Sequence, residues 1–236
     1  LGNYIGKNLF YFDTAYAKKN GIVEFTNKKN VPSGVYALIV NMKPVSFFEF
    51  IINEDKVEIE GDVSTNDINK LRESIKIKKS NENEIFYNYI NFLNKQSKSK
   101  QPLLDKKSEE GISVKEIKEL DEQIQKIDQE VINYQKNLIK THNDKYVGKL
   151  IAMSMEPGPI EVPKEVEDSL MYRYIYFRNH YWDNIDLKDD ALARTPIFHQ
   201  RLDNYFLKVI PQDPDTIINE VIKLTDQMNE TGDMFK

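Results

Sequence analysis

The spacing of apolar residues changes near Ser80, and this change limits the possible folds more than any other feature of the chain. Before Ser80, apolar and polar residues alternate in short segments, as they do in half-buried β-strands. After Ser80, apolar residues recur every third or fourth position, as they do on one face of an α-helix. The sequence therefore predicts an α+β protein in which an antiparallel β domain, residues 1–79, precedes an α-helical domain, residues 80–236.

Six short segments of the first part have the alternation and the flanking turn residues of strands. The turns include Asn20-Gly21 and Pro32-Ser33-Gly34, whose residues accept the backbone conformations of tight turns. Strands with this hairpin spacing indicate an antiparallel β-sandwich or partial barrel. The predicted strands are Thr14–Ala17, Ile22–Thr26, Val35–Asn41, Phe47–Asn53, Lys56–Glu60 and Glu73–Lys78.

The second part has the features of an α-helical bundle with one long helix. Ser113 and Glu116 have the spacing of a capping box, so a helix should begin there. Its apolar residues from Val114 to Leu138 are spaced alternately three and four apart, as in a heptad seam. Such a seam pairs with another chain or with a neighbouring helix, and its short length favours the neighbouring helix. Thr195 and Asp213 each precede a proline, which predicts two further helix starts.

Two segments of the second part lack helical periodicity. Residues 94–111 include Pro102 and contain almost no apolar side chains, which predicts a mobile loop. Residues 183–190 are acidic but lack the glycine and the closing glutamate of an EF-hand. We therefore expect a solvated acidic loop there, with no further role that the sequence identifies.

Composition excludes several functions for this segment. The 236 residues include no cysteine, so they hold no disulfide, no zinc–thiolate site and no redox-active dithiol. The formal net charge of −5 gives no general attraction to nucleic acids. No apolar run approaches the roughly 18 residues of a membrane span. We also find no glycine-rich phosphate loop, nucleophile elbow or catalytic triad, so we expect neither enzyme activity nor a bound cofactor.

The aromatic segment from Met171 to Trp182 is the candidate for a binding surface. Helical geometry spreads its rings around the helix axis, so at least half of them should face a core. The remaining rings could stack on a ligand or contact a partner protein. The residues predicted for this surface are Tyr172, Tyr176, His180 and Trp182.

His180 and Asp183 lie one helical turn apart, a spacing that would allow metal ligation or acid–base chemistry. His142 and His199 are the only other histidines, so a three-histidine metal site would need all three to converge. Because no motif with metal-ligand spacing is present, we assign no metal site and expect ordinary hydrogen bonds at a helix end.

Particular strings of residues, as distinct from their periodicity, resemble a family of bacterial envelope proteins. The first half resembles the β domain of unassigned function that precedes thioredoxin-like domains in many Gram-negative envelope proteins. The second half resembles the helical partner domain of the same proteins, and the resemblance covers nearly the whole chain. The matching strings are Asp13-Thr14-Ala15, Asn20-Gly21, Pro32–Tyr36, Phe48-Glu49-Phe50, Ser80–Glu84, Tyr172–Asp186, Arg194-Thr195-Pro196 and His199–Asp203.

The resemblance implies a periplasmic protein or an outer-membrane-anchored lipoprotein with a C-terminal thioredoxin-like domain of the TlpA or AhpC/TSA type. That domain and its Trp-Cys-x-x-Cys motif are absent from this sequence, so no catalytic residue carries over. Since the sequence begins with Leu1 and no initiator methionine, we expect it to be a segment of a longer protein.

The expected function is that of a non-catalytic accessory segment of an envelope thiol:disulfide oxidoreductase. It would position the thioredoxin-like domain or give that domain specificity for its client proteins. The alternative is a stand-alone envelope module that binds a glycan or a peptide. The expected partners are the thioredoxin-like domain, a client protein or a second copy of the chain.

Overall fold

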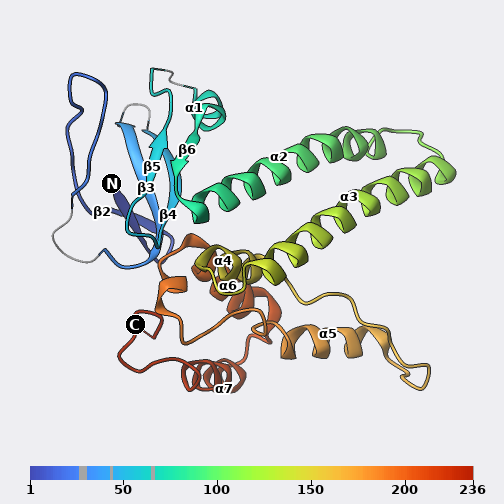
Figure 1. Cartoon of the computed structure of the whole chain (residues 1–236). Coiled ribbons are helices and arrows are strands. Elements are labelled where there is room, and N and C mark those ends of the chain that lie inside the picture. Colours follow the sequence, from blue (N-terminus) through green and yellow to red (C-terminus); the bar gives the residue numbers. More distant parts are fainter. Residues whose placement is uncertain (27–30, 43–44, 65–66, 236) are drawn as a thin grey trace. The chain divides into compact units, whose positions relative to one another are not determined.

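The structure is a computed structural model that describes residues 1–26, 31–42, 45–64 and 67–235 (Figure 1). Contacts within the chain group its residues into two compact units. Unit 1 comprises Leu1–Ser80 and Met153–Lys236, and unit 2 comprises Asn81–Ala152. This grouping differs from the two consecutive domains predicted from the sequence, because the C-terminal segment contacts the β-strands.

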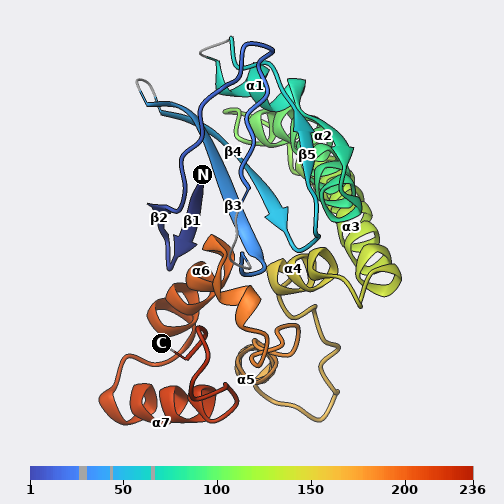
Figure 2. The same ribbon diagram turned by 60° about the vertical axis from the view of Figure 1, so that its left-hand side comes forward.

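The described strands of unit 1 form an open antiparallel sheet of four strands and a separate two-stranded ribbon, where the sequence predicts a sandwich or partial barrel. The sheet has the order β2-β1-β3-β4, and the ribbon pairs β5 with β6. Figure 2 shows β2 along one edge of the sheet. The strands are β1 (Gly2–Ile5), β2 (Asn8–Tyr11), β3 (Gly34–Met42), β4 (Val45–Ile52), β5 (Glu58–Glu60) and β6 (Lys76–Lys79).

Strand β3 is covered on both faces where it begins. Val35, Tyr36 and Ala37 are all buried, although consecutive side chains of a strand point to opposite faces. On one face, the ring of Phe12 packs edge-on against Tyr36 with 5.5 Å between ring centroids. Burial on both faces explains why this stretch reads as a continuous apolar run.

The first 26 residues differ most from the prediction. The hairpin of β1 and β2 was not predicted. Outside these residues, the short helix α1 (Ile68–Ser74), which precedes β6, was not predicted either. The predicted strands Thr14–Ala17 and Ile22–Thr26 do not form, although Gly21, at φ 78°, and a backbone hydrogen bond to Lys18 make the predicted turn. The alternation of this segment buries little, because side chains such as Tyr16 are fully exposed to solvent.

Unit 2 contains two long antiparallel helices (Figure 1). They are α2 (Asn81–Lys107) and α3 (Val114–Thr141), and α4 (Tyr146–Ser154) follows, with its last two residues in unit 1. Ser113 accepts a hydrogen bond from the Glu116 N–H at 3.2 Å, which confirms the predicted capping box. Phe92 of α2 and Tyr134 of α3 stack at 4.2 Å, which confirms that the heptad seam packs within the chain.

The predicted mobile loop at residues 94–111 is wrong, because α2 continues through this segment to Lys107 and includes Pro102. Its few apolar side chains are replaced by polar pairs with α3. Lys100 lies 2.6 Å from Asp128, Gln96 donates to Glu130 at 2.8 Å, and Lys107 pairs with Asp121. Lysine and glutamine also have high helix propensity, so this segment forms a helix without an apolar face.

The buried carboxylate of Glu82 stabilises the start of α4. It accepts hydrogen bonds from the backbone N–H groups of Tyr146 at 3.2 Å and Val147 at 2.7 Å. A carboxylate is favoured at this position because the first N–H groups of a helix have no partner within the helix. The first turn of α2 therefore determines where α4 begins.

The C-terminal part of unit 1 is helical. Its elements are α5 (Ser169–Asn179), the 3₁₀ helix η1 (Asp190–Ala193), α6 (Pro196–Asn204), the π-helix η2 (Tyr205–Val209) and α7 (Pro214–Thr225). The side chains of Thr195 and Asp213 accept hydrogen bonds from the N–H groups of Phe198 and Thr216, which confirms both predicted N-caps. Because the strands precede Ser80 and the long helices follow it, the chain is α+β, as predicted.

In the described part of the chain, no helix combines the length and the apolar character that crossing a lipid bilayer requires.

Candidate functional site

Helix α5 and the turn after it carry the four residues predicted for a binding surface. Tyr172 and Tyr176 lie in α5 and are partly buried, His180 is its C-cap, and Trp182 follows. The rings of Tyr176 and His180 stack with centroids 4.2 Å apart. His180 Nδ1 lies 2.6 Å from Asp183 Oδ2, and both side chains remain open to solvent. The predicted hydrogen bond at the helix end is therefore present.

Trp182 packs against an aromatic cluster instead of standing beside His180. Its ring lies 5.1 Å from the rings of Tyr181 and Tyr205, in edge-on geometry to both. Tyr181 and Tyr205 are almost completely buried, and they form a core cluster with Ile210. Of the predicted surface, the structure thus brings Tyr176 and His180 into contact and directs Trp182 inward.

Arg201 is buried in the same region, 5% exposed, and stacks on Tyr181. Its guanidinium carbon lies 3.9 Å from the centre of the Tyr181 ring, and its Nη2 donates to the Tyr181 carbonyl at 2.5 Å. The Tyr181 hydroxyl donates to the Arg201 carbonyl at 3.1 Å. Arg201 Nε has no hydrogen-bond partner among the described residues. Burial lowers the pKa of Arg201, since desolvation disfavours its charged form.

Glu220 of α7 connects three helical elements. It accepts hydrogen bonds from Arg178 of α5 and from the Tyr205 hydroxyl of η2, both at 2.7 Å. Burial acts to raise the pKa of Glu220, but the two hydrogen bonds, together with the charges of Lys223 and Arg178, outweigh it and the pKa is lowered. Burial, together with the hydrogen bond to Glu220, raises the pKa of Tyr205 to about 12. Tyr174 adds a further link by donating to the Val209 carbonyl at 3.0 Å.

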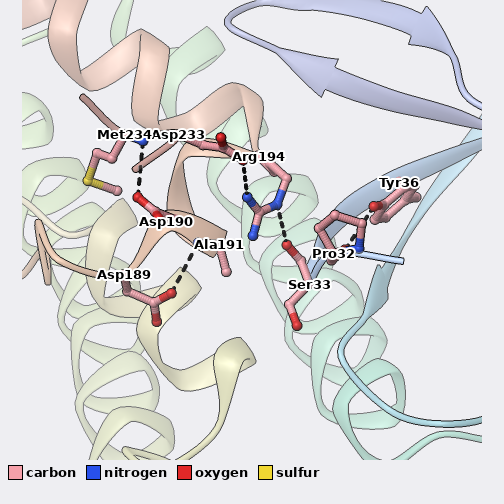
Figure 3. A network of polar contacts seen from close by, with 9 residues as sticks. All are labelled: Pro32, Ser33, Tyr36, Asp189, Asp190, Ala191, Arg194, Asp233 and Met234. Atoms are coloured by element: carbon pink, nitrogen blue, oxygen red, sulfur yellow. Dashed lines mark hydrogen bonds and ion pairs between the residues drawn. The ribbon is translucent and has the colours of Figure 1, made fainter. Parts of the chain in front are cut away.

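Arg194 joins the start of β3 to the C-terminal turn of the chain, as Figure 3 shows. Its Nε donates to the Ser33 carbonyl at 2.6 Å, and its Nη1 lies 2.7 Å from Asp233. The Arg194 carbonyl accepts a hydrogen bond from the Val35 N–H at 3.0 Å. A side chain at Gly34 would meet Arg194 Cβ at 2.8 Å, so the turn needs glycine for this close approach.

The acidic segment 183–190 is partly structural. Asp189 accepts a hydrogen bond from the Ala191 N–H at 3.1 Å and so caps η1, while Asp190 accepts one from the Met234 N–H at 3.2 Å (Figure 3). In the earlier part of the segment, Asp183 and Asp186 are exposed, whereas Ile185 and Leu187 are buried. A shallow hollow, lined by Ile185, Asp186, Leu187, Lys188, Asp226 and Gln227, lies beside it.

In the part of the chain that the structure describes, no three histidine, aspartate or glutamate side chains gather as a metal site would require. His142 is the C-cap of α3 in unit 2. His199 lies 3.7 Å from Asp203, one turn further along α6.

Large apolar side chains are exposed on several elements of unit 1, among them α5, the β1–β2 hairpin and α7, where Ile218, Val221 and Ile222 are each about half exposed. On α5, which has no buried residue, Leu170, Met171 and Ile175 are each about half or more exposed. On the β1–β2 hairpin, Ile5 is 60% and Phe10 is 47% exposed. Exposed apolar side chains that lie close together on a folded surface are typical of protein–protein contacts.

The sequence interpretation did not identify Arg201 or Glu220, and one signal was available for the first. Arg201 lies three residues after Phe198 and four before Tyr205, so it occupies the apolar stripe of its helix. A charged residue on such a stripe is buried with partners or marks a functional position. Glu220 gave no such signal, because its partners come from distant parts of the sequence.

Comparison with curated proteins and with solved structures gave no match. A family model, described as a domain of unknown function (DUF5106), matches residues 115–236. The matched region takes in nearly all of α3 and every helix after it, and it leaves the β-strands outside. Because the match covers more than half of the 236 residues, the chain belongs to the DUF5106 family.

Proposed function

We propose that this chain is a non-catalytic accessory segment of an envelope thiol:disulfide oxidoreductase. In this proposal it acts in the periplasm or at the outer membrane. It positions a thioredoxin-like domain encoded outside this sequence, or gives that domain specificity for its client proteins. With no cysteine in the chain, the thiols for disulfide exchange come from that other domain.

The observation that carries the proposal is the exposed apolar surface of α5. Arg178 of this helix donates to Glu220 at 2.7 Å and Tyr174 donates to the Val209 carbonyl at 3.0 Å, so the helix is held on unit 1. Yet Leu170, Met171 and Ile175 project into solvent. Holding three large apolar side chains in water is unfavourable, and burial against another protein surface would relieve that cost. The chemistry of this surface therefore suits a protein partner or an unfolded client.

A stand-alone module that binds a glycan or peptide is the second candidate, and the stacked pair of Tyr176 and His180 favours it. An aromatic ring next to a polar imidazole can stack on a sugar ring or a side chain. The inward position of Trp182 reduces the size of such a platform.

The test compares the full-length protein with a version that lacks residues 1–236. The two readouts are the rates of reduction of a small disulfide, oxidised glutathione, and of a protein disulfide, scrambled ribonuclease. We expect the deletion to leave the first rate unchanged and to lower the second about tenfold, equivalent to the loss of about 1.4 kcal/mol of client binding. Ile175→Asp in the full-length protein should also lower the rate of reduction of scrambled ribonuclease.

Ser169→Asp is the matched control, because it adds the same charge at the exposed start of α5, where the helix dipole favours it. It should leave both rates unchanged. A full-length protein without a thioredoxin-like domain would overturn the proposal, as would equal client rates with and without residues 1–236. Either result would favour the second candidate function, a stand-alone module that binds a glycan or a peptide.

A further inference from the structure

Strand β2 is an edge strand whose outer side presents main-chain hydrogen-bonding groups. Among the described strands of its sheet, which follow the order β2-β1-β3-β4, it pairs with β1 alone. The register pairs Asn3 with Phe10, and the Phe12 N–H donates to the Leu1 carbonyl at 2.9 Å. In an antiparallel ladder, alternate residues bond to the partner strand. The backbone N–H and C=O of Leu9 therefore point away from β1, toward the open edge.

The exposed face of the same hairpin carries two apolar side chains next to this edge. Ile5 and Phe10 both lie on the face opposite to the buried Tyr4, and both are largely in solvent. Because Ile5 is paired with Asn8 and Phe10 with Asn3, the two apolar residues are diagonal neighbours. They form a small apolar surface that runs up to the edge strand.

Apart from its length of only four residues, strand β2 lacks the features that usually protect an edge. Its sequence, Asn-Leu-Phe-Tyr, contains no charged residue and no proline, and its register with β1 shows no bulge. The turn of the hairpin is kept tight by Gly6, at φ 59°, so the edge is presented by a well-formed two-stranded unit. An unprotected edge of this kind is a template for an added strand.

We propose that the β2 edge binds an extended segment of a client protein as an additional strand. The outward N–H and C=O of Leu9 would bond to the main chain of the client. Ile5 and Phe10 would contact every second client side chain on the exposed face, which favours segments with alternating apolar residues. This inference rests on the proposed function, since it assigns the site at which the client is recognised.

A client strand suits this edge better than a second copy of the chain does. A strand of four residues has few outward hydrogen-bonding groups, and the described hairpin offers few exposed apolar side chains: Ile5 and Phe10 on one face and Tyr11 on the other. Stable dimers bury about 800 Å² on each partner, far more than such an edge provides. A weak and sequence-tolerant contact is what transient capture of many unfolded clients requires.

The experiment measures binding of a fluorescein-labelled peptide of about ten residues, with alternating valine and serine, to the whole chain by fluorescence anisotropy. Leu9→Pro removes the outward N–H, and proline is tolerated at a strand edge. Leu9→Ala is the matched control, because it removes the same side chain and keeps the N–H. We expect wild type and Leu9→Ala to bind alike and Leu9→Pro to bind about tenfold more weakly. A peptide N-methylated at every second amide should not bind.

Circular dichroism and thermal melts of both variants establish that each is folded before binding is measured. Equal affinities of Leu9→Pro and Leu9→Ala would overturn the inference, as would the absence of binding by wild type. A wild-type dimer that Leu9→Pro dissociates would assign the edge to a second copy instead. If client reduction by the full-length protein depends on residues 1–236 but is unaffected by Leu9→Pro, the edge assignment fails while the proposed function stands.

Discussion

At the scale of single residues, arginine side chains account for much of the polar architecture of unit 1. Arg178, Arg194 and Arg201 each contact groups far away in the sequence, while most lysines of the chain lie exposed on the surface. The planar guanidinium donates in several fixed directions, so one side chain can connect two segments. Arg194 does so for the turn before β3 and the C-terminal turn.

Replacing Arg194 should therefore destabilise unit 1. Arg194→Ala removes the hydrogen bond to the Ser33 carbonyl and the ion pair with Asp233, and we expect a loss of about 2 kcal/mol of unfolding free energy. Arg194→Lys should recover only part of this loss, because an ammonium group cannot reach both partners in the same fork. Urea melts of the three proteins would measure the differences.

Asp233→Asn separates the two contributions of Arg194. The Asp233 side chain is about half exposed, so solvent screens its interaction with Arg194. Asp233→Asn should therefore lower the unfolding free energy by less than Arg194→Ala does. If Asp233→Asn is as destabilising as Arg194→Ala, the hydrogen bond to Ser33 makes no contribution and this account of Arg194 is wrong.

At the scale of elements, the junction between α3 and α4 depends on a close backbone approach. A Cβ atom on Gly148, inside α4, would lie 1.9 Å from the carbonyl oxygen of His142, which caps the end of α3. Alanine has a higher helix propensity than glycine and would by itself favour α4. Since backbone cannot rotate away as a side chain can, we expect the clash to outweigh that gain.

Gly148→Ala should accordingly lower the unfolding free energy by at least about 3 kcal/mol. Gly158→Ala is the matched control, because nothing lies within 4 Å of an added Cβ there and its φ is not positive. The control should change stability by no more than about 0.5 kcal/mol. Denaturant melts of both variants would show whether the clash or the gain in helix propensity dominates. A Gly148→Ala variant as stable as wild type would mean that α4 lies elsewhere relative to α3.

Sequence patterns predict some of the helices and strands and miss others. Capping chemistry is local, so Ser113, Thr195 and Asp213 predict helix starts correctly. The second half of α2 was mistaken for a loop because the helix propensity of its lysine and glutamine residues and their polar pairs with α3 leave no apolar periodicity in the sequence. The β1–β2 hairpin was missed because its exposed apolar residues hide the alternation that marks a half-buried strand.

At the scale of the whole molecule, the grouping of the sheet with the C-terminal helices was beyond the reach of local patterns. It depends on contacts such as Arg194 with Ser33, whose partners are far apart in the sequence. The candidate surface was predictable in part. A helical turn relates Tyr176 to His180, and His180 to Asp183, so their contacts follow from local geometry. The inward packing of Trp182 requires Tyr205, which no spacing rule connects to it.

The chain as a whole should lose stability at alkaline pH through its buried tyrosines. Burial raises the pKa of Tyr4, Tyr36, Tyr181 and Tyr205, with Tyr205 reaching about 12. A phenol whose pKa is higher in the folded state than in the unfolded state stabilises the fold below its unfolded value of about 10. That contribution is lost as the pH rises through the folded pKa, so stability should fall between about pH 10 and 12.

Titration of tyrosinate absorbance, with circular dichroism recorded in parallel, would measure this effect. Tyr4, Tyr36, Tyr181 and Tyr205 should ionise only as the helical signal disappears. Tyr205→Phe removes one of these groups, so its stability should fall less steeply above about pH 10 than that of wild type. Tyr16→Phe removes the same hydroxyl group at an exposed position, so it is the matched control for the substitution itself. Ionisation of all 13 tyrosines in one step near pH 10, with the helical signal intact, would mean that these four phenols are not held within the folded core.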